Sequence, residues 1–341
     1  MRRSLPPFAI LLTGSIALAA AASSPLAEPR PLTPSKIAVT AKPIGAFDRG
    51  EPERKRFGAL EFRGGLVLQS DDKRFGGISG MHVEADGEHF VAVTDRGYWL
   101  RARMITMTGR LTGIADAEMA PMLSATGKPL DSIGWADAES LAADGGIFYV
   151  GIERVNRVLR YNLGKDGFAA RARNVSVPPA LRELPKNQGL EGLAYVPKGM
   201  PLAGALIGLS ERAPDPGGNM RGFLIGGPAP GTFSVRRSRD FDATDAAVTA
   251  KGEFLILERY LSLFRGFGAR IRSVPLDAIR PGAVIDGKVL LEAGGAHEID
   301  NMEAMAAHQH ADGETLITLA SDDNFFGFQR TLLLRFALVE D

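Results

Sequence analysis

Residues 301–323 read NMEAMAAHQHADGETLITLASDD, and residues 137–154 read DAESLAADGGIFYVGIER. Each stretch runs from an acidic residue through small and apolar residues to a glycine turn, and then through a second apolar run that ends in charged residues. Two apolar runs joined by a glycine turn predict a β-hairpin. Because the chain contains this pattern more than once, the repeat decides the fold class.

The pattern occurs five times, in residues 78–97, 138–155, 190–213, 244–261 and 302–323. The first marker position of the five copies falls at Ser79, Glu139, Glu191, Asp245 and Glu303. The second marker position falls at Asp95, Glu153, Glu211, Glu258 and Asp322. Further apolar runs follow the hairpins, so each unit has three or four strands. Such units, spaced by 52 to 60 residues, are typical of β-propeller blades.

The repeat therefore predicts an all-β chain that forms a single β-propeller. Residues 59–341 hold about five units of the mean spacing, which predicts five blades. The strands expected in residues 59–70 would complete the last blade and close the ring, leaving no open sheet edge between the ends. Residues 35–45 offer further strands, so six blades stay open as an alternative. The predicted organisation is a signal peptide over 1–22, a leader over 23–58 that wraps the domain, and the propeller over 59–341.

The N-terminal segment has the pattern of a secretory signal peptide. Arg2 and Arg3 precede an apolar run over residues 8–22, and small residues near Ala22 offer a cleavage site. This pattern predicts a periplasmic or secreted protein, with an N-terminal anchor helix as the alternative. No later stretch is long and apolar enough to predict a transmembrane segment, and the chain has no cysteine.

The balance of charges indicates which partners to expect. Lys and Arg together number 40, as do Asp and Glu, and the short basic runs at 54–56 and 236–239 are not part of a broad basic surface stripe. We therefore do not expect a nucleic acid as partner. The expected partner is a small-molecule substrate, and the expected state is a monomer.

The marker positions predict a ring of acidic side chains. In an antiparallel hairpin the start of the first strand lies beside the end of the second, so both markers of a blade lie at one rim. If these strands are the innermost ones, all blades bring their acids to one mouth of the central channel. Oxygen ligands of this kind suit a hard cation, Ca²⁺ before Mg²⁺, and the candidate ligands are Glu139, Glu191, Glu303 and Asp322.

Four of the second markers are followed directly by arginine, at Arg96, Arg154, Arg212 and Arg259. Two interpretations stay open. The arginine of one blade pairs with the acid of the next and holds the blades together, or it stabilises negative charge that develops in a reaction. Other chemistry finds no support, because the chain lacks a zinc-binding pattern, a G-x-S-x-G motif, a P-loop and a dinucleotide fingerprint.

Eight stretches, taken in chain order, match a known family pattern: RFGGISGM, VTDRG, DAESLA, NQGLEGLAY, LILERYLS, GARIRSVPL, DNMEAMA and ASDDNFFGFQRTLLLRFAL. They resemble the phytase-like family described as having esterase-like activity, from about Ala59 to the end. The resemblance implies a secreted bacterial β-propeller that hydrolyses an ester or phosphoester, with calcium as the expected metal. The positions that match the family are the rim acids together with Asn301, Asp323 and Asn324.

The chain departs from the family pattern at a few places. Ser140 and Ala304 replace a glycine that often follows the acid, and residues 244–248 carry Asp245 in place of the usual motif. These changes suit altered packing and leave the acids in place. Lys and Arg candidates for a phosphate site are sparser than in phytases proper, so phytate is not expected as the substrate.

The leading hypothesis is a metal-dependent hydrolase of esters or phosphoesters. Ca²⁺ would polarise the ester oxygen, Glu211 or Asp95 would act as general base, and one of the four arginines would stabilise the developing anion. The alternatives are a binding or scaffold propeller without catalysis, in which the rim acids are structural, and a lactonase.

Overall fold

The computed structural model describes residues 33–186, 188–238 and 240–339. All described residues belong to one compact unit, which spans residues 31–341. The predicted signal peptide and its cleavage site thus lie outside the described residues. In the part of the chain that is described, no helix is long and apolar enough to cross a membrane.

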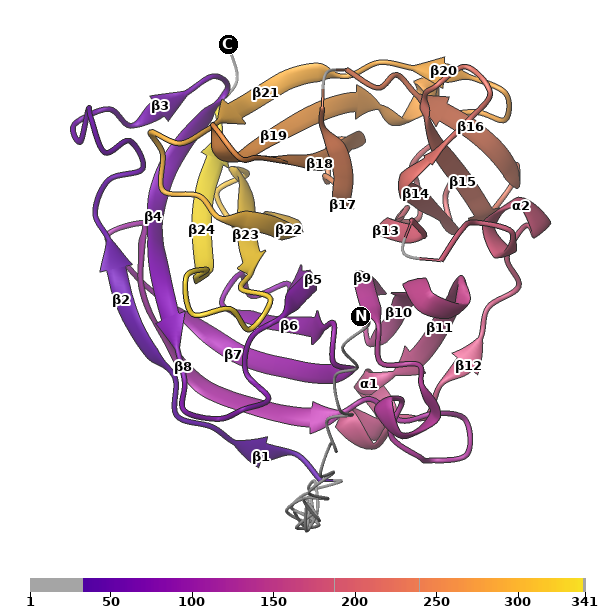
Figure 1. Cartoon of the computed structure of the whole chain (residues 1–341), viewed down its shortest axis with the longest axis horizontal. Coiled ribbons are helices and arrows are strands. Elements are labelled where there is room, and N and C mark those ends of the chain that lie inside the picture. The colour runs from indigo at the N-terminus through magenta and orange to yellow at the C-terminus, as the bar shows by residue number, and fades with distance from the viewer. Residues whose placement is uncertain (1–32, 187, 239, 340–341) are drawn as a thin grey trace, which may run out of the picture. The chain divides into compact units, whose positions relative to one another are not determined.

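Five sheets, antiparallel except for the parallel pair β16–β20, form a ring (Figure 1), so the prediction of a five-bladed propeller is confirmed. From the centre of the ring outward, blade 1 has β5 (Ile78–Val83), β6 (His89–Thr94), β7 (Tyr98–Met107), β8 (Arg110–Pro121) and β1 (Ser35–Lys36). Blade 2 has β9 (Ala138–Asp144), β10 (Ile147–Ile152), β11 (Arg157–Asn162) and β12 (Arg173–Asn174). Blade 3 has β13 (Leu190–Tyr195), β14 (Ala205–Pro214), β15 (Met220–Gly226), β16 (Gly231–Val235) and β20 (Val284–Ile285).

Blade 4 has β17 (Asp242–Val248), β18 (Glu253–Ser262), β19 (Gly266–Pro275) and β21 (Lys288–Ala293). Blade 5 has β22 (Asn301–Gln309), β23 (Thr315–Asp322), β24 (Thr331–Leu338), β4 (Leu60–Gln69) and β2 (Thr40–Ile44), with β3 (Arg56–Phe57) beside β4. Short helices lie in the connections: α1 (Leu163–Asp166), α2 (Pro179–Arg182), and the 3₁₀ turns η1 (Asp131–Ile133), η2 (Glu153–Val155), η3 (Gly167–Ala169) and η4 (Leu276–Ala278).

The ring closes as the sequence predicts, by pairing of β4 with β24 in blade 5. Residues 35–45 do contain strands, but these add no sixth blade. Strand β1 pairs with β8 at the outer edge of blade 1, and β2 pairs with β4 at the outer edge of blade 5. The N-terminal segment thus spans the junction between the first and last blades.

The hydrophobic core consists of five clusters, one at each seam between neighbouring blades. Successive side chains of a strand point to opposite faces of its sheet. In β6, Phe90 and Ala92 accordingly face the seam with blade 5. Val91 and Val93 face the seam with blade 2. Each blade therefore needs apolar residues on both faces, which explains the nearly continuous apolar runs in the repeat.

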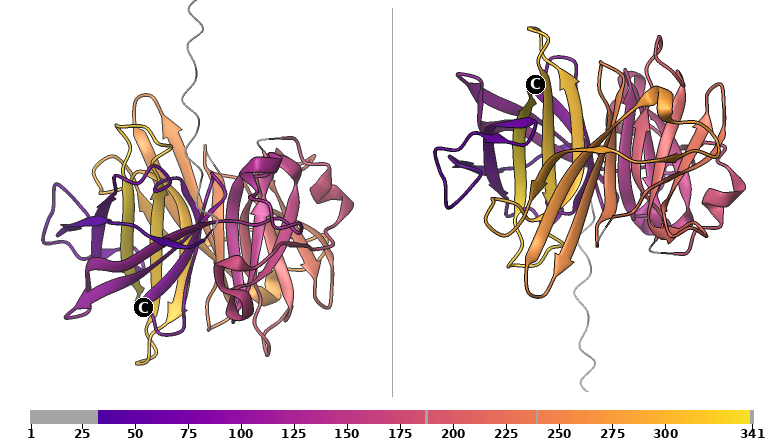
Figure 2. Two further views of the ribbon diagram at one scale, coloured as in Figure 1. Left: turned by 90° about the horizontal axis from the view of Figure 1, so that it is seen from below. Right: turned by 90° about the horizontal axis from the view of Figure 1, so that it is seen from above.

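The innermost strands determine the shape of the channel. Each of β5, β9, β13, β17 and β22 contacts the innermost strands of both neighbouring blades. Seen from the side, the strands cross the thickness of the ring, and the hairpin of β18 and β19 extends beyond it (Figure 2). Residues at the same place on the innermost strands therefore meet at the same rim.

Candidate functional site

Each innermost strand has one β-bulge, and in four of the five blades the bulged residue occupies the first marker position. The pairing register skips a residue between Ile78 and Gly80, and again at the matching place in each other blade. A bulge adds one unpaired residue and redirects its side chain. The bulged residues are Ser79, Glu139, Glu191, Thr244 and Glu303.

In blade 4 the bulge corrects the sequence alignment. The alignment places Asp245 beside the acids of the other blades, whereas the register shows that Thr244 holds this position. The Asp245 side chain is completely buried and accepts hydrogen bonds from the backbone N–H groups of Ala246 (2.8 Å) and Met305 (2.7 Å). Burial raises the pKa of Asp245 well above its usual value. Asp245 is thus a link between blades 4 and 5 and not a rim acid.

The two bulged residues without a carboxylate also link blades. The Ser79 hydroxyl donates to the carbonyl oxygen of Ala138 at 2.5 Å, and the Thr244 hydroxyl donates to that of Met302 at 3.0 Å. In both cases the acceptor precedes the bulged glutamate of the next blade. The first marker position therefore supplies three acids, Glu139, Glu191 and Glu303.

The second marker position is also shifted by one residue in blade 4. Asp322 pairs with Asn301, and in the same place of blade 4 Arg259 pairs with Asp242. The residues that line this rim position are Asp95, Glu153, Glu211, Arg259 and Asp322.

The prediction that Glu258 lies at the rim is therefore wrong. Adjacent residues of a strand point to opposite faces of the sheet, so the side chains of Glu258 and Arg259 lie on opposite faces of blade 4. Glu258 is completely buried and forms ion pairs with Arg270 (2.7 Å) and Arg272 (2.6 Å).

Three buried glutamates from blades 2 and 3 form a compact group, the glutamate triad: Glu153, Glu191 and Glu211. One oxygen of each lies within 4.8 Å of one oxygen of each of the others. Burial raises the pKa of Glu191 well above its usual value, and repulsion from Glu139, Glu211 and Glu153 raises it further. Burial raises the pKa of Glu211 to about 6, although Arg212 and Arg259 oppose the shift. The triad thus resists carrying three negative charges unless a cation is near.

Glu153 is not among the metal ligands predicted from the sequence. Its Oε1 accepts a hydrogen bond from the backbone N–H of Gly189 at 2.9 Å, which orients it toward blade 3. Burial raises its pKa. Glu153 and Glu211 are both second markers of the repeat, so the repeat itself could have identified Glu153 as a candidate ligand.

A second acidic group lies on the side of blades 1 and 5. Burial raises the pKa of Asp322 to about 9, helped by the charges of Glu303 and Asp95. Burial also raises the pKa of Asp95 to about 7, with Arg96 acting against the shift and Glu303, Asp137 and Asp323 adding to it. Glu139 connects both groups: burial raises its pKa well above the usual value, and Glu303, Asp137 and Asp95 contribute.

The four arginines differ in their partners. Arg259 Nη2 lies 3.1 Å from Glu303 Oε1 and 3.5 Å from Glu211 Oε1, so it contacts the acids of both neighbouring blades. Arg212 pairs with Asp242 of the next blade at 2.7 Å. Arg154 pairs at 3.5 Å with Asp137, which belongs to its own blade. Arg96 lies over the ring of Phe325, with its guanidinium carbon 3.0 Å from the ring centre.

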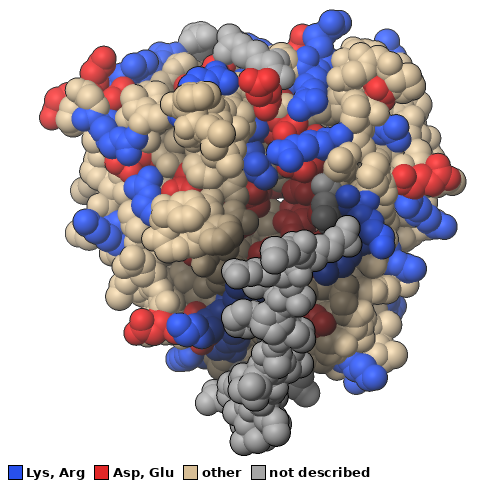
Figure 3. Space-filling view, in the orientation of Figure 1, with Lys and Arg blue, Asp and Glu red and all other residues tan. Residues whose placement is uncertain are grey.

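The mouth is acidic in sum, and acidic side chains gather in the hollow at the centre of the ring in Figure 3. Its donor set consists of oxygen atoms. Among the described residues, Asp95 Oδ1 and Asn301 Oδ1 are buried without a hydrogen-bond partner, while the amide nitrogen of Asn301 donates to Glu303 at 2.7 Å. Clustered carboxylates and orphaned buried oxygens fit a hard divalent cation such as Ca²⁺.

Asp323, a ligand candidate from the family resemblance, has a structural environment. Its Oδ1 accepts from the backbone N–H of Gly77 at 3.1 Å, and its Oδ2 accepts from the Thr331 hydroxyl at 2.9 Å. Both oxygens therefore already have protein donors. Asp323 holds the β23–β24 loop against the loop that precedes β5.

This arrangement requires glycine at residue 77. Gly77 has φ +63°, and a Cβ there would lie 2.1 Å from Asp95 Oδ1 and 2.9 Å from the ring of Phe325. The absence of a side chain lets Asp95 and Phe325 approach the backbone. The GG pair of RFGGISGM thus shapes this side of the mouth.

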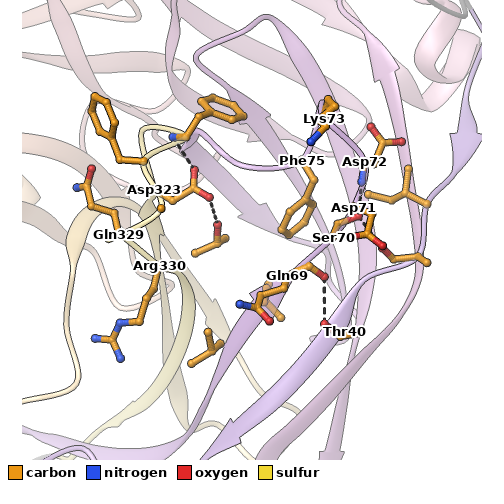
Figure 4. A pocket seen from close by; sticks show the side chains of 18 of the residues that line it. Thr40, Gln69, Ser70, Asp71, Asp72, Lys73, Phe75, Asp323, Gln329 and Arg330 are labelled. Atoms are coloured by element: carbon orange, nitrogen blue, oxygen red, sulfur yellow. Dashed lines mark hydrogen bonds between the residues drawn. The ribbon is translucent and has the colours of Figure 1, made fainter.

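A groove of about 1110 Å³ extends outward from Asp323 between blades 5 and 1 (Figure 4). Phe75, Phe325 and Phe326 supply apolar lining, and Lys73 and Arg96 supply positive charge. The N-terminal segment around Lys36–Thr40 forms its outer side. The groove therefore offers space for a molecule beside the mouth.

Comparisons with known proteins match one family model and include solved structures of low similarity. A family model described as "Phytase-like: Esterase-like activity of phytase" matches residues 73–325. No curated protein matches the chain. The crystal structure of Myxococcus xanthus glutaminyl cyclase is similar at 12% identity and a TM-score of 0.40, over 78% of this chain and 92% of that one. A candidate 6-phosphogluconolactonase from Bacteroides uniformis is similar at 13% identity and a TM-score of 0.38, over 85% and 94%.

Proposed function

We propose, because the chain belongs to the phytase-like family, that it hydrolyses an ester or phosphoester at the acidic mouth of the propeller with the help of a bound divalent cation. The observation that carries this proposal is the glutamate triad, whose oxygens from two blades lie within 4.8 Å of one another. Such a group has little reason to be buried as a structural element, because it destabilises the empty protein by mutual repulsion.

The triad residues Glu153, Glu191 and Glu211 would hold the cation, and Ca²⁺ is the preferred candidate for all-oxygen ligands. Glu139 lies next to the triad. Glu303 and Asp322 of the second acidic group, together with Asn301, form the facing acidic group on the side of blades 1 and 5. When bound, the cation would neutralise this charge and polarise the ester oxygen.

Asp95 is the better candidate of the two predicted general bases. Glu211 belongs to the triad and contacts Arg212 and Arg259. Asp95 instead has an oxygen without a partner, and its pKa of about 7 would let it accept a proton from water near neutral pH.

Arg96 is the best candidate among the arginines for stabilising a developing anion. It is exposed and lines the groove, whereas Arg154, Arg212 and Arg259 are engaged with carboxylates. Stacking on Phe325 holds its guanidinium group at the edge of the mouth. The rest of a small-molecule substrate would lie in the groove between blades 5 and 1.

A binding or scaffold propeller is the second candidate function. It is favoured by the contacts of Arg259 and Arg212, which join blades 3, 4 and 5 and would do so without any catalysis. A lactonase, the other alternative, also hydrolyses an ester because lactones are cyclic esters, so the assays described next include a lactone. We further propose that the protein acts as a monomer in the periplasm or outside the cell, as its N-terminal pattern predicts, and that it binds no nucleic acid.

The test uses protein that starts after residue 22, first treated with a chelator and then supplied with Ca²⁺ or Mg²⁺. Turnover of 4-nitrophenyl acetate, 4-nitrophenyl phosphate, bis(4-nitrophenyl) phosphate and a simple lactone is measured in each state. The proposal expects turnover of at least one compound that depends on the cation and is lost in Glu191→Gln. Glu183→Gln is the matched control, because Glu183 is exposed and lies outside the mouth.

The two candidate functions give different results. If Ca²⁺ raises the unfolding temperature but no compound is turned over, the scaffold interpretation replaces the hydrolase. If no divalent ion changes either stability or turnover, the metal-dependent mechanism is wrong.

A further inference from the structure

A second concave site lies on blade 2, on its outer strands and apart from the acidic mouth. We call it the blade 2 basic pocket. It has a volume of about 660 Å³ and is formed by β11, β12 and the segment around α1. Its charged lining consists of four cationic side chains and one acid: Arg160, Lys165, Arg171, Arg173 and Asp166.

The strand register places like charges directly opposite each other. Arg160 of β11 pairs with Arg173 of β12 in an antiparallel ladder. Directly opposed residues have Cβ atoms about 4.5–5.5 Å apart, and like charges in such a pair are destabilising. Arg171 precedes Arg173 by two residues in the same segment, and it lines the same pocket. The fold therefore gathers three guanidinium groups where local repulsion acts against it.

None of these cations is neutralised within the part of the chain that the structure describes. Other arginines of the same blade have partners: Arg157 donates to Asn174 at 3.2 Å, and Arg154 pairs with Asp137. Arg160, Arg171 and Arg173 have neither a side-chain hydrogen bond nor an ion pair with a described residue. The Arg171 guanidinium group lies beside Gly127, where an added Cβ would be 3.3 Å from it.

We propose that the blade 2 basic pocket binds a dianionic phosphate group, either free phosphate or the phosphate of a monoester. Four cations against one acid leave a surplus of three positive charges, which a dianion offsets better than a single carboxylate does. Guanidinium groups present paired donors that match the oxygens of phosphate, and several of them can surround one tetrahedral anion. This binding needs neither the acidic mouth nor catalysis, so it is independent of the proposed function.

The test is isothermal titration calorimetry with inorganic phosphate and, separately, glycerol 2-phosphate. Ionic strength is held constant with chloride, and a chelator keeps divalent cations out of the mouth. We expect saturable binding at one site, and at least tenfold weaker binding for the double variant Arg160→Gln/Arg173→Gln. Tighter binding of glycerol 2-phosphate would identify a monoester as the ligand, and tighter binding of phosphate the free anion.

The double variant Arg182→Gln/Arg280→Gln is the matched control, since both arginines are exposed and lie outside this pocket. It makes the same change in net charge and should bind as the wild type does. The proposal fails if the wild type shows no saturable binding, or if the two double variants bind equally well.

Thermal unfolding provides a check on folding. At low ionic strength without phosphate, Arg160→Gln/Arg173→Gln should unfold at the same or a higher temperature than the wild type, because a repulsion is removed. Phosphate should raise the unfolding temperature of the wild type and of the control, but not of this variant. An equal rise in all three proteins would overturn the proposal.

Discussion

Arg259 Nη2 lies 3.1 Å from Glu303 Oε1, although the two residues belong to different blades, and the same nitrogen lies 3.5 Å from Glu211 Oε1 of a third blade. Blade 4 therefore places a cation at the rim position where the other four blades place a carboxylate. The side chain of Arg259 is only 17% exposed, so its ion pairs are poorly screened by water and salt. Arg259 consequently connects the glutamate triad with the facing acidic group.

Arg259→Gln should destabilise the protein strongly. Removing one partner of a buried ion pair leaves the other charge uncompensated, which costs about 3–5 kcal/mol. Arg212→Gln is the comparison and should cost less, because Arg212 is half exposed and its buried partner Asp242 keeps a second ion pair with Arg237. Urea unfolding of both variants measures the difference in the free energy of unfolding. Equal losses would show that Arg259 has no special role in joining the blades.

Glu258→Gln should reduce stability without affecting Ca²⁺ binding, whereas Glu211→Gln should weaken Ca²⁺ binding. Glu258 is completely buried between Arg270 and Arg272, so its loss should reduce stability by about 3–5 kcal/mol and leave Ca²⁺ binding unchanged. Loss of Glu211 should weaken Ca²⁺ binding, because Glu211 belongs to the triad. Calorimetric titration with Ca²⁺ and urea unfolding are measured for both variants. If Glu258→Gln impairs Ca²⁺ binding as much as Glu211→Gln does, Glu258 faces the channel and the one-residue offset of blade 4 is wrong.

The stability of chelated protein should fall as the pH rises. Burial raises the pKa of Glu211 to about 6, of Asp95 to about 7 and of Asp322 to about 9, from ordinary values of 4.5 for Glu and 3.8 for Asp. Between about pH 4 and pH 9 these three carboxyls bind more protons in the folded state than in the unfolded state. They outnumber the buried His82 and His308, whose pKa of about 4 acts in the opposite direction below about pH 6.5, so the free energy of unfolding decreases with pH. Thermal unfolding across this range measures the trend.

Added Ca²⁺ should reduce this loss of stability at high pH, because the cation compensates the ionised carboxylates. Glu191→Gln should reduce the pH dependence even without a cation. A flat profile in the chelated wild type would mean that the rim carboxylates are ionised or solvated like surface groups.

Gly77→Ala should be more harmful than the same change at an open glycine. Both Gly77 (φ +63°) and Gly109 (φ +74°) have left-handed backbones, which alanine adopts at a cost of about 1–2 kcal/mol. A Cβ at Gly77 would also collide with Asp95 Oδ1, whereas nothing lies within 4 Å at Gly109. We expect Gly77→Ala to lose Ca²⁺-dependent turnover and further stability, and Gly109→Ala to lose stability only. Similar behaviour of the two variants in assays and urea unfolding would argue against a packed Asp95–Phe325 contact.

Much of the fold could be predicted because a blade is a local structure. Strand, glycine turn and strand follow one another in residues 137–154, and hydrogen bonds between neighbouring strands need no information from distant parts of the chain. The pairing of residues 59–70 with the last blade was predictable for a related reason, since an open ring would expose two sheet edges. The outer strands β1 and β2 were harder to assign, because short strands carry little pattern.

The candidate site was predicted in part. Glu139, Glu191, Glu303, Asp95, Glu211 and Asp322 all lie at the mouth, as their place in the repeat indicates. Glu153 joins Glu191 and Glu211 across the seam between blades 2 and 3, and this distance depends on how the blades pack.

The sequence by itself determined that the chain forms hairpin blades and that both markers of a hairpin lie at one rim, because antiparallel pairing within each hairpin fixes these features locally. It left five or six blades open. Only the tertiary structure decided which residues of blade 4 face the channel. A shift of one residue moves a strand side chain to the other face, and the bulge at Thr244 sets that shift. Arg259 therefore faces the acids of two neighbouring blades, while Glu258 is buried with two arginines in its own blade.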